Sequence, residues 1–265
     1  MKISACIIIL CFLTFPTQML FAQDNLIKLM SYNIYHGENP YKPGTPNVED
    51  IANLIREISP DFLALQEVDS MTQRTAGFAG EKLDLTKVWA EKTGMFGHFA
   101  KAIDFSDGGY GEAVLTKENA VFESLDLPVP EGGEGRSVAI AHVELPGGKR
   151  LAFAGTHLCH ENPINRAAQV KAILDHFKNI DYPVIITGDF NFESDEKGYS
   201  LMAEYFHDAA LEVDNLENTY SSEEPKIRID YFWVPKSSGI EVLSVQTISV
   251  NHSDHLPLVM EIIIP

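Results

Sequence analysis

The sequence predicts an α/β fold in which short buried strands alternate with amphipathic helices. The clearest strand lies at Tyr182–Ile186, where β-branched and apolar residues follow one another after Pro183. An uninterrupted apolar run of this length is typical of a strand buried on both faces. A second such strand covers Phe62–Leu65, and a helix with one apolar face precedes it. This alternation is typical of α/β proteins.

The first half of the chain is expected to continue this pattern. A strand at Leu26–Ile34 is followed by a helix that Asn47 caps and Ser59-Pro60 ends. The stretch Ser70–Gly80 is predicted to be a polar loop in which Arg74 faces solvent, with contact to a phosphate as the alternative. A helix then covers about Asp84–Lys92. Further strands are expected at residues 97–102, 110–115, 121–127, 137–145 and 150–156, the last two forming a hairpin.

The second half repeats the alternation of helices and strands. Asn162-Pro163 opens one helix before the strand at Tyr182–Ile186, and another helix covers about Ser194–Tyr205. The remaining predicted strands are Lys226–Val234, Glu241–Ser249 and Leu258–Ile263.

The amino terminus has the pattern of a secretory signal peptide. Lys2 precedes an apolar run from Ile3 to Phe15, and Leu20-Phe21-Ala22 is a suitable cleavage site. The run is short for a membrane span, so no stable membrane insertion is expected. Residues 1–22 are therefore predicted to be removed, and residues 23–265 to form one exported domain, periplasmic or secreted.

Cysteine usage and charge limit the classes of function. Cleavage would leave Cys159 alone, so no internal disulfide is expected, and a small buried hydrophobic residue is its expected role. The chain has 38 acidic against 20 basic residues and a net charge of −18. This charge disfavours binding of nucleic acid through its backbone, but a divalent cation could still attract a phosphate ester.

Polar side chains recur at or next to the ends of predicted strands. Each of them alone fits a strand that ends in a turn. Together they supply the oxygen ligands that Mg²⁺ or Mn²⁺ prefers, and histidines that exchange protons near neutral pH. Hydrolysis of a phosphate ester needs such groups. The set comprises Asn33, Glu67, His157, Asp189, Asn191, Asp230, Asp254 and His255.

The order of these motifs resembles the endonuclease/exonuclease/phosphatase superfamily, which includes DNase-I-like nucleases. The motifs are Ser-Tyr-Asn-Ile, Leu-Gln-Glu-Val, Thr-His-Leu, Gly-Asp-Phe-Asn, Arg-Ile-Asp-Tyr and Ser-Asp-His-Leu-Pro. They extend from about Leu26 to the carboxyl terminus. The resemblance implies a four-layer sandwich, with two mixed β-sheets packed face to face and helices outside.

The resemblance also implies a metal site. Glu67 would be the main ligand of Mg²⁺, with Mn²⁺ as an alternative ion, and Asn33 and Asp254 would complete the site. Glu112, in Tyr-Gly-Glu-Ala, resembles the deoxyribonuclease pattern and would orient His157.

Catalytic roles follow from the same resemblance. Asp189 would orient or deprotonate the attacking water, and Asn191 would hold Asp189 and the phosphoryl group. His157 and His255 would donate hydrogen bonds to the phosphoryl oxygens. Asp230 would fix the tautomer of His255 and raise its basicity.

Four further polar residues lie beside motif residues. Arg136 matches the family pattern, and a structural ion pair and a phosphate contact both remain open for it. His36, His160 and His252 are expected at the surface or behind the catalytic residues.

These observations predict an exported, metal-dependent phosphoesterase, acting as a monomer on a phosphodiester or a phosphomonoester. An endonuclease acting on nucleic acid remains an alternative, since Glu112 fits that pattern, whereas the acidity favours a smaller phosphoester. A catalytically silent binding module is a second alternative. The sequence contains no Gly-x-Ser-x-Gly motif, which excludes a typical α/β hydrolase of other esters.

Overall fold

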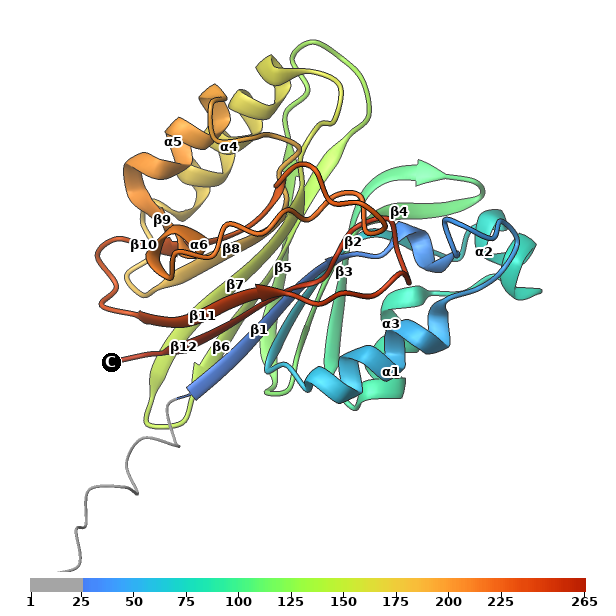
Figure 1. The fold of residues 1–265 in the computed structure, drawn as a ribbon, viewed down its shortest axis with the longest axis horizontal. Helices are drawn as coiled ribbons and strands as arrows, with labels where there is room; N and C mark the ends of the chain where they lie inside the picture. The colour runs from blue at the N-terminus through green and yellow to red at the C-terminus, as the bar shows by residue number, and fades with distance from the viewer. Residues whose placement is uncertain (1–25) are drawn as a thin grey trace, which may run out of the picture.

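The computed structural model describes residues 26–265 and arranges their strands in two six-stranded sheets (Figure 1). The predicted signal peptide, residues 1–22, lies outside the described residues. The first sheet has the order β11 (Glu241–Thr247), β12 (Leu258–Ile263), β1 (Leu26–Asn33), β2 (Phe62–Ser70), β4 (Gly108–Thr116) and β3 (Phe96–Phe105). The second has the order β5 (Ala120–Leu127), β6 (Arg136–Leu145), β7 (Lys149–His157), β8 (Val184–Asp189), β10 (Asp230–Pro235) and β9 (Phe206–Asp208).

Helices cover the outer face of each sheet (Figure 1). The helices α1 (Val48–Ile58) and α3 (Leu85–Thr93) pack on the first sheet. The helices α4 (Pro163–Phe177) and α5 (Lys197–Tyr205) pack on the second. β1 runs parallel to β2, and β7 runs parallel to β8. β1 and β12 run antiparallel, as do β8 and β10, so both sheets are mixed. The predicted four-layer sandwich is confirmed.

Burial on both faces explains the uninterrupted apolar runs. In β1, Leu29 points into the core between the sheets, whereas Met30 packs with α1 and α3. In β8, Ile185 points between the sheets and Ile186 towards α4. Since successive side chains of a strand point to opposite faces, each of these strands needs apolar residues at consecutive positions.

The first and last described strands lie side by side. β1 pairs with β12 in antiparallel register from Leu26 and Ile263 to Ser31 and Leu258. On its other side β1 pairs with β2 in parallel, which places Asn33 opposite Gln66. β1 therefore lies in the interior of the sheet only because β12, the last strand of the chain, pairs with its second edge.

The stretch Ser70–Gly80 corrects the predicted polar loop. It contains a helix, α2 (Gln73–Ala79), whose first turn Thr72 caps by accepting from the Thr75 backbone N–H. Arg74 does not simply face solvent. Its guanidinium donates to both oxygens of the fully buried Asp69, over 2.8 and 2.6 Å, and lies 4.5 Å from the ring centroid of Phe105.

Replacing Arg74 with alanine is expected to lower the free energy of unfolding by about 3–5 kcal/mol, because the Asp69 carboxylate would stay buried without its partner. Denaturant unfolding of both proteins measures the difference. Arg150→Ala is the matched control, since Arg150 pairs with the exposed Asp181 and such pairs contribute about 0–1 kcal/mol. Equal losses in the two variants would contradict a structural role for the Asp69–Arg74 pair.

Two smaller expectations also need correction, and two short elements were not predicted. Asn47 precedes α1 as predicted, but its side chain forms no cap bond and instead donates to the His252 carbonyl oxygen over 2.7 Å. The strand predicted from Lys226 begins only at Asp230. The short elements β9 and α6 (Ala209–Glu212) follow α5 without a sequence signal that separates them from it.

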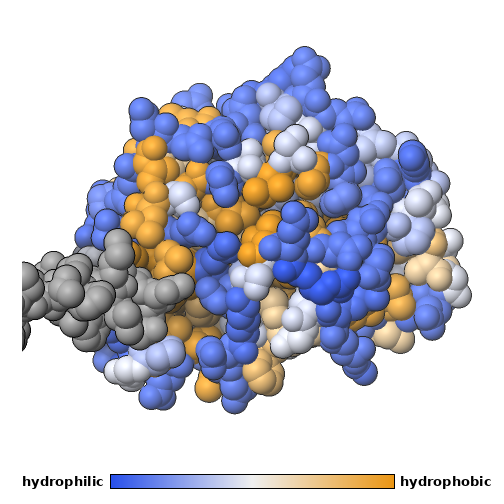
Figure 2. Space-filling model, turned by 60° about the horizontal axis from the view of Figure 1, so that its bottom comes forward, coloured by the Kyte–Doolittle hydropathy of each residue, from blue (hydrophilic) through white to orange (hydrophobic). Residues whose placement is uncertain are grey.

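The surface is mostly hydrophilic on the face shown in Figure 2, with apolar residues gathered in patches. Among residues 26–265 no helix is long and apolar enough to cross a membrane. Cys159 is 2% exposed and has no disulfide partner among residues 26–265, as a small core residue should be.

Candidate active site

The carboxyl ends of β7 and β8 and the amino end of the antiparallel β10 bring polar side chains to one edge of the second sheet. His157, at the end of β7, is the register partner of Asp189, at the end of β8. Asp189 in turn pairs with Asp230, the first residue of β10. Side chains at paired positions lie on the same face of a sheet. The register alone therefore places His157, Asp189 and Asp230 in a row.

Gly188 lets β8 run this close to β7. Its φ is +138°, and a β-carbon there would lie 1.9 Å from the carbonyl oxygen of Thr156. Any other residue would displace the backbone immediately before Asp189. Glycine is therefore needed at this position of the Gly-Asp-Phe-Asn motif because the Thr156 backbone lies so close, and not only because a strand ends there.

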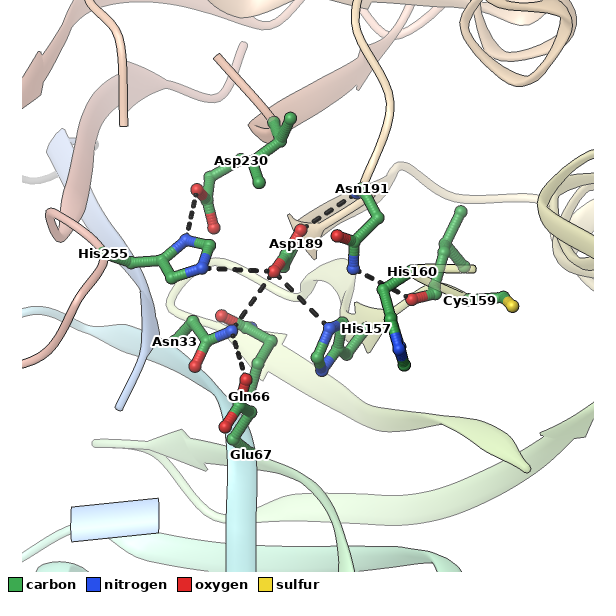
Figure 3. Close-up of polar contacts among 12 residues, drawn as sticks. Asn33, Gln66, Glu67, His157, Cys159, His160, Asp189, Asn191, Asp230 and His255 are labelled. Carbon is green, nitrogen blue, oxygen red and sulfur yellow. Dashed lines mark hydrogen bonds and ion pairs between the residues drawn. The ribbon is translucent and has the colours of Figure 1, made fainter. Parts of the chain in front are cut away.

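The carboxylate of Asp189 is the centre of the cluster (Figure 3). Its Oδ2 accepts from Asn33 Nδ2 over 3.1 Å and lies 3.5 Å from the Nε2 atoms of both His157 and His255. Its Oδ1 accepts from the Asn191 backbone N–H over 2.9 Å. Burial raises the pKa of Asp189 to about 7. The group can therefore exchange a proton near neutral pH.

His255 lies between two carboxylates. Its Nδ1 is 2.9 Å from Asp230 Oδ2, and its Nε2 faces Asp189. Burial would lower the pKa of His255, but the charges of Asp230 and Asp189 raise it to about 10. The imidazole is therefore held in its protonated form, with Asp230 as the partner that was predicted.

His157 has the opposite electrostatic environment. Burial and the positive charge of Arg136 lower its pKa well below the usual range, so the ring is neutral. The structure shows no hydrogen bond between His157 and Glu112. Glu112 Oε2 instead accepts from the hydroxyl of Ser137, while Glu112 Oε1 and His157 Nδ1 are buried without partners. Orientation of His157 by Glu112 stays a prediction.

A β-bulge presents Glu67 to the cluster. The register of β2 against β4 shifts between Leu65 and Val68, and Glu67 has a φ of +61°. A bulge of this kind re-aims a side chain near the end of a strand. Glu67 Oε1 accepts from Asn33 Nδ2 over 3.1 Å, so Asn33 connects the two sheets by bridging Glu67 and Asp189.

The groups around Glu67 fit a divalent cation. Burial would raise the pKa of Glu67, but the nearby His36 and His157 outweigh it and lower the pKa to about 2. The carboxylate thus stays ionised while largely enclosed, as a ligand of a hard cation must. Burial, and after it the negative charge of the nearby Glu67, raises the pKa of Asp254.

Two details bear on the other predicted ligands. Asn33 turns its NH₂ group towards the carboxylates, and its Oδ1 accepts from the Tyr35 N–H over 3.3 Å. Ligation by the Asn33 oxygen would require rotation of that amide. Asp189, Asp230 and His255 also have candidate ligand atoms within 4.8 Å of one another. Because a protonated His255 has no free lone pair, this triad suits proton transfer better than metal binding.

Asn191 and Arg136 flank the cluster. Asn191 Nδ2 donates to the Leu158 carbonyl oxygen over 3.1 Å, so it joins the loops that follow β7 and β8. The Arg136 side chain is 2% exposed, and it contacts Glu134 and the Nδ1 of His160. These contacts favour the structural ion pair that the sequence left open for Arg136.

One residue of the site, Tyr220, was missed by sequence reasoning. Tyr220 is 37% exposed, and its ring centroid lies 4.8 Å from that of His255. It lies in a polar loop without a periodic pattern, so only the backbone bridge between Tyr220 and His255 reveals its place. His36 was expected at the surface or behind the catalytic residues, and it lies behind them: it is 6% exposed and its Nδ1 is 3.9 Å from Glu67 Oε2.

Two cavities of the described residues lie away from the site. One cavity lies between the start of β1 and the β6–β7 turn, and another between the ends of α4 and α5. Neither is lined by a predicted site residue. Charge and hydrogen bonding, rather than cavity size, mark the candidate active site.

Comparison with known proteins supports the resemblance found in the sequence. The profile of the Endonuclease/Exonuclease/phosphatase family matches residues 30–255, a range that includes all nine predicted site residues. No curated protein shows a significant match to the chain.

Several solved structures share the fold. A conserved protein of unknown function from Enterococcus faecalis V583 superposes with a TM-score of 0.75 and 21% identity, over 90% of this chain and 100% of that one. The human Nocturnin catalytic domain, with bound sulfate, superposes with a TM-score of 0.70 and 23% identity, over 91% of this chain and 94% of that one. A mannosyl-6-phosphatase from Bacteroides thetaiotaomicron VPI-5482 superposes with a TM-score of 0.68 and 18% identity, over 89% of this chain and 99% of that one.

Proposed function

Because the chain belongs to the endonuclease/exonuclease/phosphatase family, whose members hydrolyse phosphoester bonds, we propose that it is a divalent-metal-dependent phosphoesterase. The observation that carries this proposal is the Asp189 carboxylate, which lies within 3.5 Å of two histidine nitrogens and joins Glu67 through Asn33. A general base, a cationic donor and a metal-binding carboxylate thus lie in one cluster.

The hydrolysis assigns a separate task to each group. Asp189 accepts a proton from water as the water oxygen bonds to phosphorus and the bond to the leaving oxygen breaks. Protonated His255 donates to a phosphoryl oxygen and stabilises the negative charge that develops there. Neutral His157 donates a second hydrogen bond through Nε2. Glu67, with Asn33 and Asp254 as further candidates, would hold the divalent cation, which would supply Lewis-acid polarisation of the phosphoryl group.

Two observations favour a small phosphoester over nucleic acid as the substrate. The net charge of −18 repels a polyanion at long range. Tyr220 also presents an exposed ring beside His255, and partial burial together with the negative charge of Asp254 raises the pKa of its hydroxyl. A sugar or another compact ring could pack on such a surface next to the phosphoryl group.

The test is hydrolysis of three probes, bis(p-nitrophenyl) phosphate, p-nitrophenyl phosphate and supercoiled plasmid, each with Mg²⁺, Mn²⁺ or EDTA. We expect turnover of a small ester that requires the metal and falls to the uncatalysed rate in EDTA. The Asp189→Asn variant is the matched control, because it separates catalysis by this site from a contaminating enzyme.

The other outcomes are equally informative. Plasmid nicking that EDTA stops would replace the small-ester proposal with the nuclease alternative, which the Glu112 pattern supports. Turnover of the small esters that persists in EDTA would contradict metal dependence. Absence of turnover with all three probes would favour the silent binding module.

We also propose that the protein is exported, which rests on the sequence of residues 1–22. A buried, unpaired Cys159 is compatible with an oxidising compartment. Amino-terminal sequencing of the protein from the culture medium or periplasm should begin at Gln23. Recovery of the full-length chain from the cytoplasm alone would contradict export. That the protein acts as a monomer stays a prediction.

A further inference from the structure

The turn after β1 forces His36 inward. Tyr35 and His36 have φ values of +44° and +45°, a conformation that residues other than glycine rarely adopt. The His36 ring is 6% exposed and lies 6.3 Å from the ring of Phe78. Backbone strain of this kind is kept where the surrounding structure fixes it, commonly at functional sites.

The two ring nitrogens of His36 have different surroundings. Nε2 lies 3.2 Å from Glu38 Oε2, and a carboxylate can only accept, so Nε2 carries the hydrogen. Nδ1 is buried without a hydrogen-bond partner and lies 3.9 Å from Glu67 Oε2. In the neutral ring the lone pair of Nδ1 thus faces a carboxylate oxygen across a gap too long for a hydrogen bond.

This arrangement is the one that metal-binding histidines adopt. Such a histidine usually donates its other N–H to a carboxylate, which fixes the tautomer and the ring orientation. Bonds from divalent cations to imidazole nitrogen and carboxylate oxygen are about 2.0–2.2 Å long, so one ion can bridge Nδ1 and Oε2 with little movement. The contact that Glu67 makes with Asn33 uses its other oxygen, Oε1, and leaves Oε2 free.

We propose that His36 Nδ1 is a ligand of the divalent cation that Glu67 binds, with Glu38 orienting the imidazole. This inference rests on the metal dependence proposed above. It also changes the expected choice of metal. Imidazole suits transition metals such as Zn²⁺ and Fe²⁺, whereas Mg²⁺ prefers oxygen ligands. The site should therefore select a transition metal over Mg²⁺ more strongly than an all-oxygen site would.

The test measures Mn²⁺ binding by electron paramagnetic resonance, with Mg²⁺ affinity obtained by competition. His36→Gln should weaken Mn²⁺ binding by at least about tenfold and Mg²⁺ binding by less, so the Mn²⁺/Mg²⁺ preference falls. His207→Gln is the matched control, since His207 is largely exposed and pairs with Glu212 away from the site. Circular dichroism and thermal unfolding check the fold of each variant.

A second measurement uses the unaltered protein and does not depend on how His36→Gln folds. Electron spin echo modulation of bound Mn²⁺ should show a directly bonded nitrogen, whose signal changes when histidine is labelled with ¹⁵N. Mn²⁺ binding without such a nitrogen would overturn the role of His36 and leave metal dependence intact. A nitrogen signal that persists in a folded His36→Gln variant would assign the ligand to another histidine. No Mn²⁺ binding at all would count against the proposed function itself.

Discussion

Replacing Asp189 with asparagine is expected to lower kcat by about 10²–10⁴-fold, the usual contribution of a general base. The amide has nearly the shape of the carboxylate and can still accept from the Asn191 N–H, so the loop after β8 should keep its position. Because burial disfavours the ionised form of Asp189, removing the charge should cost little stability. The measurement is kcat on the small ester that the wild-type protein hydrolyses.

Two companion variants complete this experiment. Asp189→Ala should lose at least as much activity, since it also removes the contacts with Asn33. Asp181→Asn is the control, because Asp181 is an exposed residue that pairs with Arg150 before β8 begins. An Asp189→Asn variant with activity within tenfold of the wild type would remove Asp189 from the role of base.

The second large effect concerns His255. Replacement by alanine should lower kcat/KM by about 10²–10⁴-fold, because it removes the protonated donor beside Asp189. His176→Ala is the control, since His176 lies on α4 and pairs with Glu123. Activity near the wild-type value in a folded His255→Ala variant would show that His255 is not the donor.

The pH dependence gives a more specific signature of the same group. The active form combines ionised Asp189, whose raised pKa is about 7, with protonated His255, whose pKa is about 10. Activity should therefore rise as the pH passes 7 and fall as it passes 10, and a bound cation would move both limbs to lower pH. These apparent values belong to the interacting groups together.

Asp230→Asn should move the entire profile to lower pH. The Asp230 carboxylate raises the pKa of both neighbours, so its loss lowers the alkaline limb through His255 and the acid limb through Asp189. A general loss of structure would lower the rate at every pH and leave the limbs in place. An unchanged profile in Asp230→Asn would contradict the assigned pair.

The sequence predicted best those elements whose burial is uniform. The central strands β1, β2 and β8 were found because both of their faces are covered, which leaves a continuous apolar run. The helix α2 was missed because its segment is polar. Its stability comes from the Asp69–Arg74 pair and from packing on Phe105, which are tertiary contacts that no local pattern encodes.

The candidate site was predictable as a set of strand ends and less predictable in its geometry. The order of motifs located His157 and Asp189, and the strand register explains why they meet. The bulge that turns Glu67 towards Asn33 depends on how β2 pairs with β4. The place of Tyr220 depends on a bridge to His255 across a long loop. Both are long-range pairings, so a single sequence gives no direct signal for them.

The pairing of β1 with β12 also determines when the first sheet and the candidate active site can be completed during synthesis of the chain. Until Leu258–Ile263 leave the ribosome, one edge of β1 has no partner, and an unpaired apolar edge invites aggregation. His255 also emerges just before that closing strand. Contacts between such distant parts of a chain make folding slow. Truncated or stalled chains should therefore stay unfolded and chaperone-dependent, and such a late-folding chain is well suited to a route that carries unfolded polypeptides across a membrane.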